Sequence, residues 1–122
     1  MITSKEQIID YFKSGIKDNK NFKIGIEHEK FLFNINDNTR IDYSKIKDMF
    51  SGLAEVGWKP VYDKENVVAL NKEGKNITLE PGNQIELSGD KLNHIHEACS
   101  ESQDYLFELK QVTKKLDIEI VS

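Results

Sequence analysis

Residues 77–88 read ITLEPGNQIELS and contain two strand-like segments on either side of a turn. Residues 84–88 alternate between polar and apolar side chains, which is typical of a strand with one buried face. Residues 76–79 form a shorter run of β-forming side chains. Pro81 and Gly82 fit the central positions of a type II turn. Because that turn type is not favoured in tight hairpins, a corner between strands is as good an interpretation as a hairpin.

Helices and further strands surround this segment. Apolar residues at helical spacing predict helices at about 4–17, 43–56 and 91–116. Runs of β-forming residues predict strands at 23–33, 58–62, 67–71, 76–79 and 84–88, and the start of another at 118–122. Thr3 and Glu6 have the spacing of a capping box for the first helix, and Gly57 supplies a stop for the second. The expected fold class is α+β, an antiparallel sheet with flanking helices.

Length, composition and charge limit the classes of function. The 122 residues are 38% hydrophobic and 31% charged, as in one globular domain. The formal net charge of −4 gives no basic footprint for nucleic acid. No run suits a membrane helix or a signal peptide, and the single Cys99 cannot form an intrachain disulfide. We therefore expect a cytoplasmic protein with no nucleic-acid or membrane partner.

The residues that point most clearly to chemistry are acidic and lie in two of the expected strands. Side chains alternate across a strand, so Glu27 and Glu29 share a face and lie roughly 6.5–7 Å apart. By the same rule, Gln84, Glu86 and Ser88 share a face of the other strand. Neighbouring carboxylates repel each other when both are ionised and unpaired, and a bound divalent cation removes that cost. Each strand therefore has an apolar side for packing and a side that bears carboxylates.

A metal site is one interpretation of these carboxylates. Four of them could converge on one polar cavity, and they are Glu27, Glu29, Glu80 and Glu86. An oxygen-rich cluster suits Mg²⁺, whereas the Cys/His spacing of structural zinc is absent. The alternative is an ordinary solvated face of an antiparallel sheet. Phe31 and Phe33 share the face of Glu27 and Glu29, which favours a face that is not simply open to water.

Other candidate residues have structural interpretations. His28 points to the apolar side of its strand, as a partly buried structural histidine would. His94 and His96 lie two positions apart on the expected helix, so they diverge and form no helical metal pair. Cys99 lies on the apolar stripe of the long helix, where we expect a small buried side chain and not a nucleophile. The chain has no Gly-rich phosphate loop of the Walker or Rossmann type.

Two segments resemble motifs of one enzyme family, the glutamate–cysteine ligases of the plant and proteobacterial type. Residues 24–31, IGIEHEKF, are similar to the family motif G-x-E-H-E-K-F. Residues 77–89 are similar to I-T-L-E-P-G-G-Q-x-E-L-S-G, with Asn83 where the family usually has Gly. Residues 92–101 resemble the start of the helix that follows in the family. The resemblance runs from about residue 5 to the C-terminus, and the two acidic motifs in this order are specific together.

The resemblance implies a glutamine-synthetase-like carboxylate–amine ligase fold, in which an antiparallel sheet curved into a funnel holds Mg²⁺ and ATP. It implies ligation of L-glutamate, activated as γ-glutamyl phosphate, to L-cysteine, which is the first step of glutathione biosynthesis. The metal ligands implied by this resemblance are Glu27, Glu29, Glu80 and Glu86. Asn83 and Gln84 could contact the glutamate substrate, although a turn and strand role suits them equally.

Chain length is the main departure from the family. Its enzymes run to roughly three or four domain lengths, and the basic residues that they use for ATP phosphates and the glutamate carboxylate are not in these 122 residues. We expect 1–122 to be the N-terminal segment of a larger catalytic domain, with the rest of the polypeptide after Ser122 and no ligase activity alone. Two alternatives remain: a ligase of the same superfamily with another amine acceptor, and a non-catalytic module that binds a divalent ion or a protein.

Overall fold

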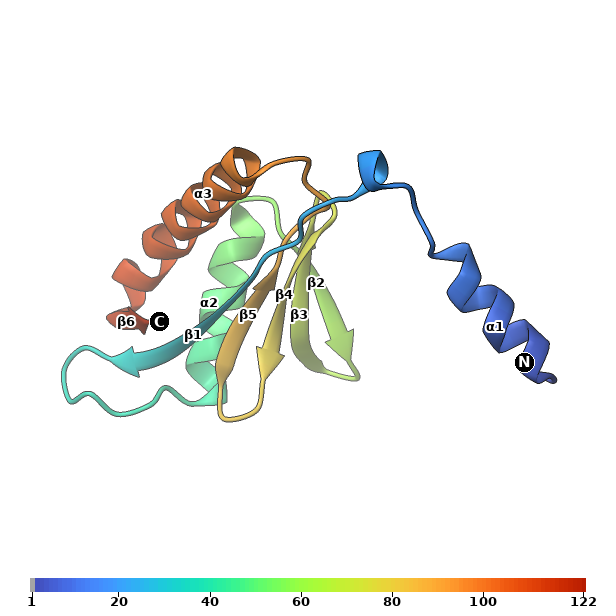
Figure 1. Ribbon diagram of the computed structural model, residues 1–122. Coiled ribbons are helices and arrows are strands. Elements are labelled where there is room, and N and C mark those ends of the chain that lie inside the picture. Colours follow the sequence, from blue (N-terminus) through green and yellow to red (C-terminus); the bar gives the residue numbers. More distant parts are fainter. Residues whose placement is uncertain (1) are drawn as a thin grey trace.

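The computed structural model describes residues 2–122 and shows a twisted antiparallel sheet with two helices packed on one face (Figure 1). The elements in chain order are α1 (Lys5–Ser14), the 3₁₀ turn η1 (Asn19–Asn21), β1 (Glu27–Asn34), α2 (Tyr43–Glu55), β2 (Lys59–Asp63), β3 (Asn66–Lys72), β4 (Lys75–Glu80), β5 (Gln84–Ser88), α3 (Ile95–Thr113), the 3₁₀ turn η2 (Lys114–Leu116) and β6 (Ile118–Val121). This arrangement confirms the α+β class expected from the sequence.

The sheet has the strand order β2-β3-β4-β5-β1-β6, and every neighbouring pair is antiparallel. Strand β1 joins the two parts of the sheet, because its first half pairs with β5 and its second half pairs with β6. The strand expected at the end of the chain is therefore confirmed. Strand β1 begins at Glu27, later than expected, since Ile24 forms an isolated bridge with Leu92 instead.

The turn after Glu80 is a hairpin, and the interpretation of a corner is wrong. Strands β4 and β5 are neighbours, with Glu80 paired to Gln84 across a three-residue loop. Gly82 (φ 74°) and Asn83 (φ 58°) both adopt the left-handed conformation that closes this loop. Asn tolerates this conformation better than most residues with a side chain. Asn83 therefore fits a position where the family usually has Gly.

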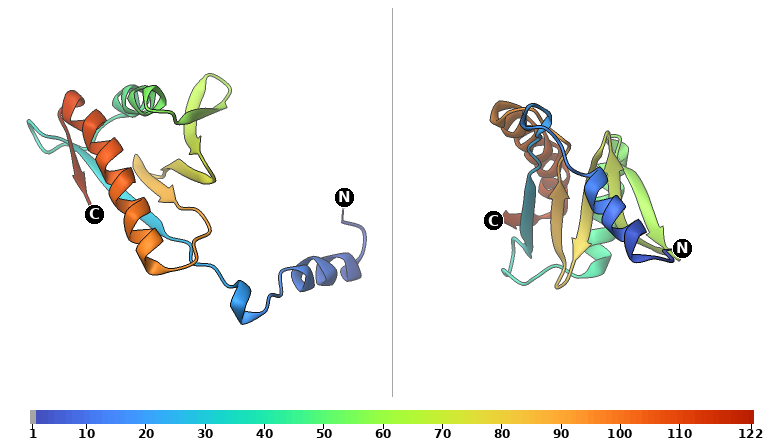
Figure 2. Two further views of the ribbon diagram at one scale, coloured as in Figure 1. Left: turned by 90° about the horizontal axis from the view of Figure 1, so that it is seen from above. Right: turned by 45° about the vertical axis from the view of Figure 1, so that its right-hand side comes forward.

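The core lies between the sheet and the pair α2 and α3, which cover the same face (Figure 2). Its most deeply buried members include Leu32, Ile46, Met49, Phe50, Leu53, Leu70, Ile77, Ile85, Leu87 and Leu109. Burying an aliphatic or aromatic side chain of this size stabilises the fold by roughly 1.5–3 kcal/mol. Each strand of the central hairpin contributes its apolar side, as the alternation of residues 84–88 predicted.

Helix α3 is rotated relative to the apolar stripe read from the sequence. Its buried residues include Ala98, Glu101, Tyr105 and Leu109, so Cys99 lies about 100° away on the helix and is exposed. The expectation that Cys99 is buried is therefore wrong. The sequence pattern failed here because the buried face of the helix includes an acidic and a phenolic side chain.

Helix α1 stands apart from the rest of the molecule (Figures 1 and 2). It begins one residue later than the capping box of Thr3 and Glu6 predicts. Ser4 accepts a hydrogen bond from the Gln7 backbone, and the Gln7 side chain accepts one from the Thr3 backbone.

Across residues 2–122, no helix is both long enough and apolar enough to cross a membrane.

Candidate functional site

The candidate site is the face of the sheet opposite α2 and α3. Strands β1, β5 and β4 lie side by side there, and cross-strand register brings their acidic residues together. Glu29 of β1 is the direct partner of Glu86 of β5, and Thr78 of β4 is the partner of Glu86 on its other side. Directly paired residues on one face have Cβ atoms roughly 4.5–5.5 Å apart. The carboxylates of the two acidic motifs are therefore neighbours in the folded chain.

A second row of polar side chains runs beside the first across five strands. Its members are cross-strand partners in the order Glu27, Ser88, Asn76, Asn71 and Lys59. On the other side of the Thr78–Glu86 pair, two residues further along β4 and β5, Glu80 is paired with Gln84. The face thus carries all four glutamates singled out from the sequence, with hydroxyl and amide groups between them.

Neighbouring side chains orient three of the four carboxylates. Thr78 Oγ1 donates to Glu80 Oε1 at 2.7 Å, and Ser88 Oγ donates to Glu86 Oε1 at 3.1 Å. Gln84 Nε2 donates to Glu29 Oε2 at 3.2 Å. These donors come from β4 and β5, two of the three strands that carry the carboxylates. They hold the carboxylates without adding positive charge to the face.

The face is open to solvent in this chain. Glu27 and Glu29 are exposed, and no helix of the described chain covers them. The expectation of a covered face, drawn from Phe31 and Phe33, is not met by residues 2–122. Phe31 is 37% exposed, and its ring is partly shielded by the Arg40 guanidinium, 5.2 Å from the ring centroid.

The oxygen atoms around the Glu29–Glu86 pair suit a hard cation. Carboxylates, hydroxyls and amide oxygens are the ligands that Mg²⁺ prefers, and neither imidazole nor thiol occurs among the cross-strand partners just described. Within residues 2–122, however, no three His, Cys, Asp or Glu side chains lie close enough together to hold one ion. The chain therefore provides the donor chemistry and a shared face, but not an assembled ligand cluster.

The two residues expected to contact substrate have different positions. Asn83 Nδ2 donates to the backbone oxygen of Ile41 at 2.9 Å, so its side chain ties the hairpin to the segment before α2. Gln84 lies on the carboxylate face, where it bonds to Glu29. Of the two, only Gln84 points its side chain to the candidate site.

Two polar side chains of β1, those of His28 and Lys30, lie on the other side of the strand from Glu27 and Glu29. His28 Nε2 lies 2.9 Å from Ser102 Oγ, which confirms the interpretation of His28 as a partly buried structural residue. Lys30 is 6% exposed and donates from Nζ to Ser122 Oγ at 2.7 Å. Sequence reasoning did not single out Lys30. The strand alternation that placed Glu27 and Glu29 outward could have placed it on the buried side.

Glu101 of α3 supports the end of β5 from this buried side. Its Oε2 accepts from the Asp90 backbone N–H at 3.0 Å, and a Cβ added to Gly89 would overlap its Oε1. Gly89 in turn donates its backbone N–H to Ile26 at 2.8 Å. Glu101 thus fixes the loop that follows Ser88, although sequence reasoning did not identify it.

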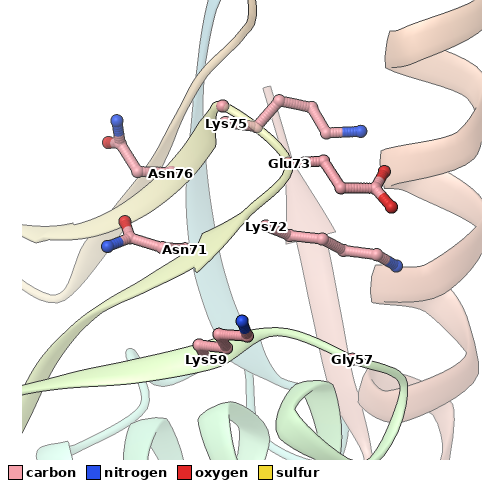
Figure 3. A pocket seen from close by; sticks show the side chains of 8 residues that line it. Gly57, Lys59, Asn71, Lys72, Glu73, Lys75 and Asn76 are labelled. Atoms are coloured by element: carbon pink, nitrogen blue, oxygen red, sulfur yellow. The ribbon is translucent and has the colours of Figure 1, made fainter.

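A surface hollow of about 680 Å³ borders the carboxylate face at the β3–β4 hairpin (Figure 3). It is lined by Gly57, Lys59, Asn71, Lys72, Glu73, Gly74, Lys75 and Asn76. Lys72 is held by Glu108, with Nζ and Oε1 2.5 Å apart, and lies over the ring of Trp58. Lys59 and Lys75 have no carboxylate within 4.0 Å among residues 2–122. Lys59 lies in the row of the carboxylate face, whereas Lys75 is the cross-strand partner of Lys72 and points to the helix side (Figure 3). Of these three lysines, Lys59 is therefore the one that adds positive charge at the margin of the face.

Comparison with known proteins gives one consistent result. The model of glutamate-cysteine ligase family 2 matches residues 23–122. Glutamate–cysteine ligase A, chloroplastic, of Oryza sativa subsp. japonica is 39% identical over 116 residues, which cover 94% of this chain and 24% of that protein. The chloroplastic glutamate–cysteine ligases of Medicago truncatula and Arabidopsis thaliana are 36% and 35% identical over the same share of the chain, and 23% and 22% of their lengths are covered. The chain spans about a quarter of the length of the curated relatives it matches.

These names contradict the expectation of a cytoplasmic protein. The relatives are named as chloroplastic proteins and not as cytoplasmic ones. The expectation rested on the lack of an apolar run suited to secretion. Plastid transit segments are Ser-rich and amphipathic instead, so that observation could not separate the two locations.

Proposed function

Since the chain belongs to glutamate-cysteine ligase family 2, we propose that it is the N-terminal segment of a longer enzyme that ligates L-glutamate to L-cysteine. ATP is the co-substrate of the proposed reaction. It transfers its γ-phosphoryl group to the glutamate γ-carboxylate, and the cysteine amine then displaces phosphate to give γ-glutamylcysteine. This is the first step of glutathione biosynthesis. Residues 1–122 supply one wall of the site and have no ligase activity alone.

The observation that carries this proposal is the direct pairing of Glu29 with Glu86 on the open face of the sheet. Each residue belongs to one of the two acidic motifs, which lie more than fifty positions apart in the sequence. Because a shift of one residue in register would turn either side chain to the helix side, their meeting on one face depends on the observed register. A structural strand face does not require two acidic residues to be opposite each other, since like charges at that position are destabilising.

We propose that Mg²⁺ binds at this face and that Glu27, Glu29, Glu80 and Glu86 are the side chains that would hold it. Within residues 2–122 these carboxylates share the face but are not gathered around one point. When bound, Mg²⁺ offsets the negative charge of the carboxylate and of the triphosphate that react with each other. The hydroxyl groups of Thr78 and Ser88 and the amide of Gln84 keep three of these carboxylates oriented. A carboxylate that is already oriented loses less side-chain entropy when it binds a ligand.

The positive charge of Lys59, at the β2 edge of the carboxylate face, supports the same proposal. Glutamate and ATP are both anionic, while the face itself carries four carboxylates. Positive charge at the border of such a face favours the approach of anionic substrates. The remaining contacts to the ATP phosphates, to the glutamate carboxylate and to cysteine come, in this proposal, from the polypeptide after Ser122.

The test uses the longer protein and two isosteric changes, Glu29→Gln and Glu86→Gln. Each change removes one negative charge from the paired position and should lower cysteine-dependent ADP release by at least about 100-fold, with a higher Mg²⁺ requirement. Glu65→Gln, in the turn between β2 and β3, is the matched control and should leave both quantities unchanged. Thermal unfolding of each variant checks that the fold is retained.

The outcomes separate the alternatives. Unchanged activity and unchanged Mg²⁺ dependence in both variants would remove the metal assignment. ADP release that is equally fast with other amines in place of cysteine would favour a related ligase with another acceptor. A reading frame that stops at Ser122, with a stable monomer that binds Mg²⁺ but releases no ADP, would favour a non-catalytic binding module.

A further inference from the structure

Helix α1 has an apolar face that no described part of the chain covers. It contributes no buried residue and contacts none of the other helices and strands. Ile8 and Ile9 are 43% and 39% exposed, and Phe12 and Ile16 are 72% and 79% exposed. Figure 1 shows the helix at the end of an extended segment, away from the sheet, and the view from above in Figure 2 agrees.

The helix is nevertheless well specified by its sequence. Ile8, Ile9 and Phe12 lie within about 100° of one another around the axis, while Glu6, Asp10 and Ser14 lie on the opposite side. Ile16 follows just past the end of the helix. At its N-terminus, Ser4 Oγ accepts from the Gln7 backbone N–H and Gln7 Oε1 accepts from the Thr3 backbone N–H. A helix of ten residues is marginal in water by itself, and most helical stability in proteins comes from packing an amphipathic face. A capped amphipathic helix that packs on no described residue indicates that its packing surface lies outside residues 2–122.

The relatives that share this helix are much longer than this chain. The plant relatives match 94% of this chain, so the matched residues must include most of α1. The same match covers only 22–24% of each relative, so about three-quarters of their length has no counterpart in this chain. Helix α1 is thus part of the segment shared with much longer proteins.

We infer that the apolar face of α1, formed by Ile8, Ile9 and Phe12 and continued by Ile16 just past the helix end, docks against the part of the same polypeptide that follows Ser122. This inference rests on the proposed function, in which residues 1–122 begin a longer enzyme. The segment between α1 and β1 makes such docking possible. It pairs with the body of the molecule at Ile24, which bridges Leu92, and leaves about nine residues before it as a tether. Those residues can span up to about 30 Å.

A second copy of the chain and a membrane are less suitable occupants. One stripe of four side chains falls well short of the roughly 1,200–2,000 Å² that a stable interface between separate chains buries. A tethered partner avoids that requirement, because covalent linkage raises its effective concentration to about the millimolar range. A helix that binds at an anionic membrane surface carries a basic polar face, whereas α1 has Lys5 and Lys13 balanced by Glu6 and Asp10.

Hydrogen exchange tests the docking directly. In the 122-residue chain, the backbone amides of α1 should exchange at nearly unprotected rates, because the helix is unsupported. In the longer protein, the same amides should exchange at least about tenfold more slowly. The protection of the α1 amides should not depend on protein concentration. Measuring the size of the longer protein in solution shows whether this protection needs a second copy of the chain.

Two matched substitutions give the test its specificity. Phe12→Ser removes the central apolar side chain, and Asp10→Ser makes a similar change on the polar side. In the longer protein, Phe12→Ser should abolish the added protection of α1 and Asp10→Ser should retain it. In the 122-residue chain, neither substitution should change the midpoint of thermal unfolding by more than about 1 °C, since α1 packs on nothing there.

Unprotected α1 amides in the longer protein would overturn the inference. Protection that appears only with dimerisation would assign the face to a second copy and would overturn it as well. Both results are independent of ADP release and of Glu29→Gln, so a failed docking test leaves the proposed ligase reaction standing. If instead no longer protein exists, the proposed function fails with it.

Discussion

At the scale of single residues, Asn83 shows how one side chain can serve the fold at a position that resembles a substrate contact. Its backbone is in the left-handed region, at φ 58°, and its amide donates to the Ile41 carbonyl at 2.9 Å. Both features close the hairpin that presents Gln84 and Glu86. The structure thus gives Asn83 a turn role, one of the two roles that its position in the sequence allowed.

Substitutions at Asn83 should separate conformation from hydrogen bonding. Asn83→Gly keeps the left-handed conformation and loses only the bond to Ile41, so we expect a loss of about 0.5–1.5 kcal/mol in the free energy of unfolding. Asn83→Ala loses the bond and also strains the backbone, which adds about 1 kcal/mol or more. Urea unfolding of the three proteins measures the order Asn, Gly, Ala. Equal stability of the Gly and Ala variants would show that the left-handed conformation is not retained.

The sequence predicted well which face the four glutamates share and predicted poorly the burial of Cys99, because strands and helices differ in how strictly the sequence sets their buried side. Alternation along a strand is rigid, so Glu27 and Glu29 had to share a face once the strand was recognised. On a helix, a rotation of 100° per residue makes the buried face depend on what it packs against. In α3 that face includes Glu101 and Tyr105, which no apolar pattern selects.

At the scale of elements, the crossing of α2 and α3 depends on a glycine. Gly52 lies within α2 where the helix meets Val112 of α3, and an added Cβ would lie 2.6 Å from Val112 Cγ1. In an exposed helix, Gly→Ala stabilises by roughly 0.5–1 kcal/mol. Here the overlap should dominate, because inserting one carbon into a packed interface costs about 1–3 kcal/mol.

We therefore expect Gly52→Ala to lower the free energy of unfolding, in contrast to the helix propensities. Val112→Ala removes the two methyl groups that the new Cβ would meet. The double variant Gly52→Ala/Val112→Ala should then be more stable than the sum of the single effects predicts. A double-mutant cycle measured by urea unfolding gives this coupling. Purely additive effects would mean that the helices move apart freely at this crossing.

The first turn of α3 has a reciprocal cap that makes its stability depend on pH. The Asn93 backbone N–H donates to Glu97 Oε2 at 2.6 Å, and this bond holds the pKa of Glu97 below its ordinary value. A lowered pKa means that the ionised carboxylate stabilises the fold at pH values above the ordinary carboxyl range. This contribution is lost as the pH falls through the lowered pKa.

Glu97→Gln should accordingly lower the midpoint of thermal unfolding at neutral pH. The difference from the unchanged chain should shrink on acidification and vanish once Glu97 is protonated. Differential scanning calorimetry over a series of pH values provides the measurement. A difference that stays constant down to strongly acidic pH would assign the effect to packing and not to the charge on Glu97.

The sequence predicted the presence of each helix and strand more accurately than the residues at which they begin and end. The helix expected at 91–116 begins at Ile95, because His94 serves as its N-cap. The strand expected at 23–33 begins at Glu27, because Ile24 pairs with Leu92. In these cases the end of an element is set by a partner distant in the sequence or by a cap type that patterns do not single out.

At the scale of the whole molecule, the sheet has one completed face and one open face. The helix side holds the core, whereas the side with Glu29 and Glu86 is polar and exposed. Its donor atoms come from three adjacent strands, yet residues 2–122 bring no three acidic, histidine or cysteine side chains around one point. The sequence could predict which carboxylates share a face. It could not predict how far apart their ends lie, since that depends on side-chain rotamers and on whatever covers the face.

The two ends of the chain should differ sharply in what they contribute to stability. Helix α1 buries no side chain, whereas β6 pairs with β1 and places Ile118, only 3% exposed, in the core. Removing residues 1–16 should shift the midpoint of thermal unfolding by no more than about 2 °C. Removing residues 118–122 deletes a buried isoleucine and the hydrogen-bond partner of Lys30, which should cost about 2–5 kcal/mol. Calorimetry of both truncated chains measures these two losses of stability. A comparable loss from the N-terminal truncation would mean that α1 packs on the sheet already in the 122-residue chain, and that its apolar face is not free to receive another part of the polypeptide.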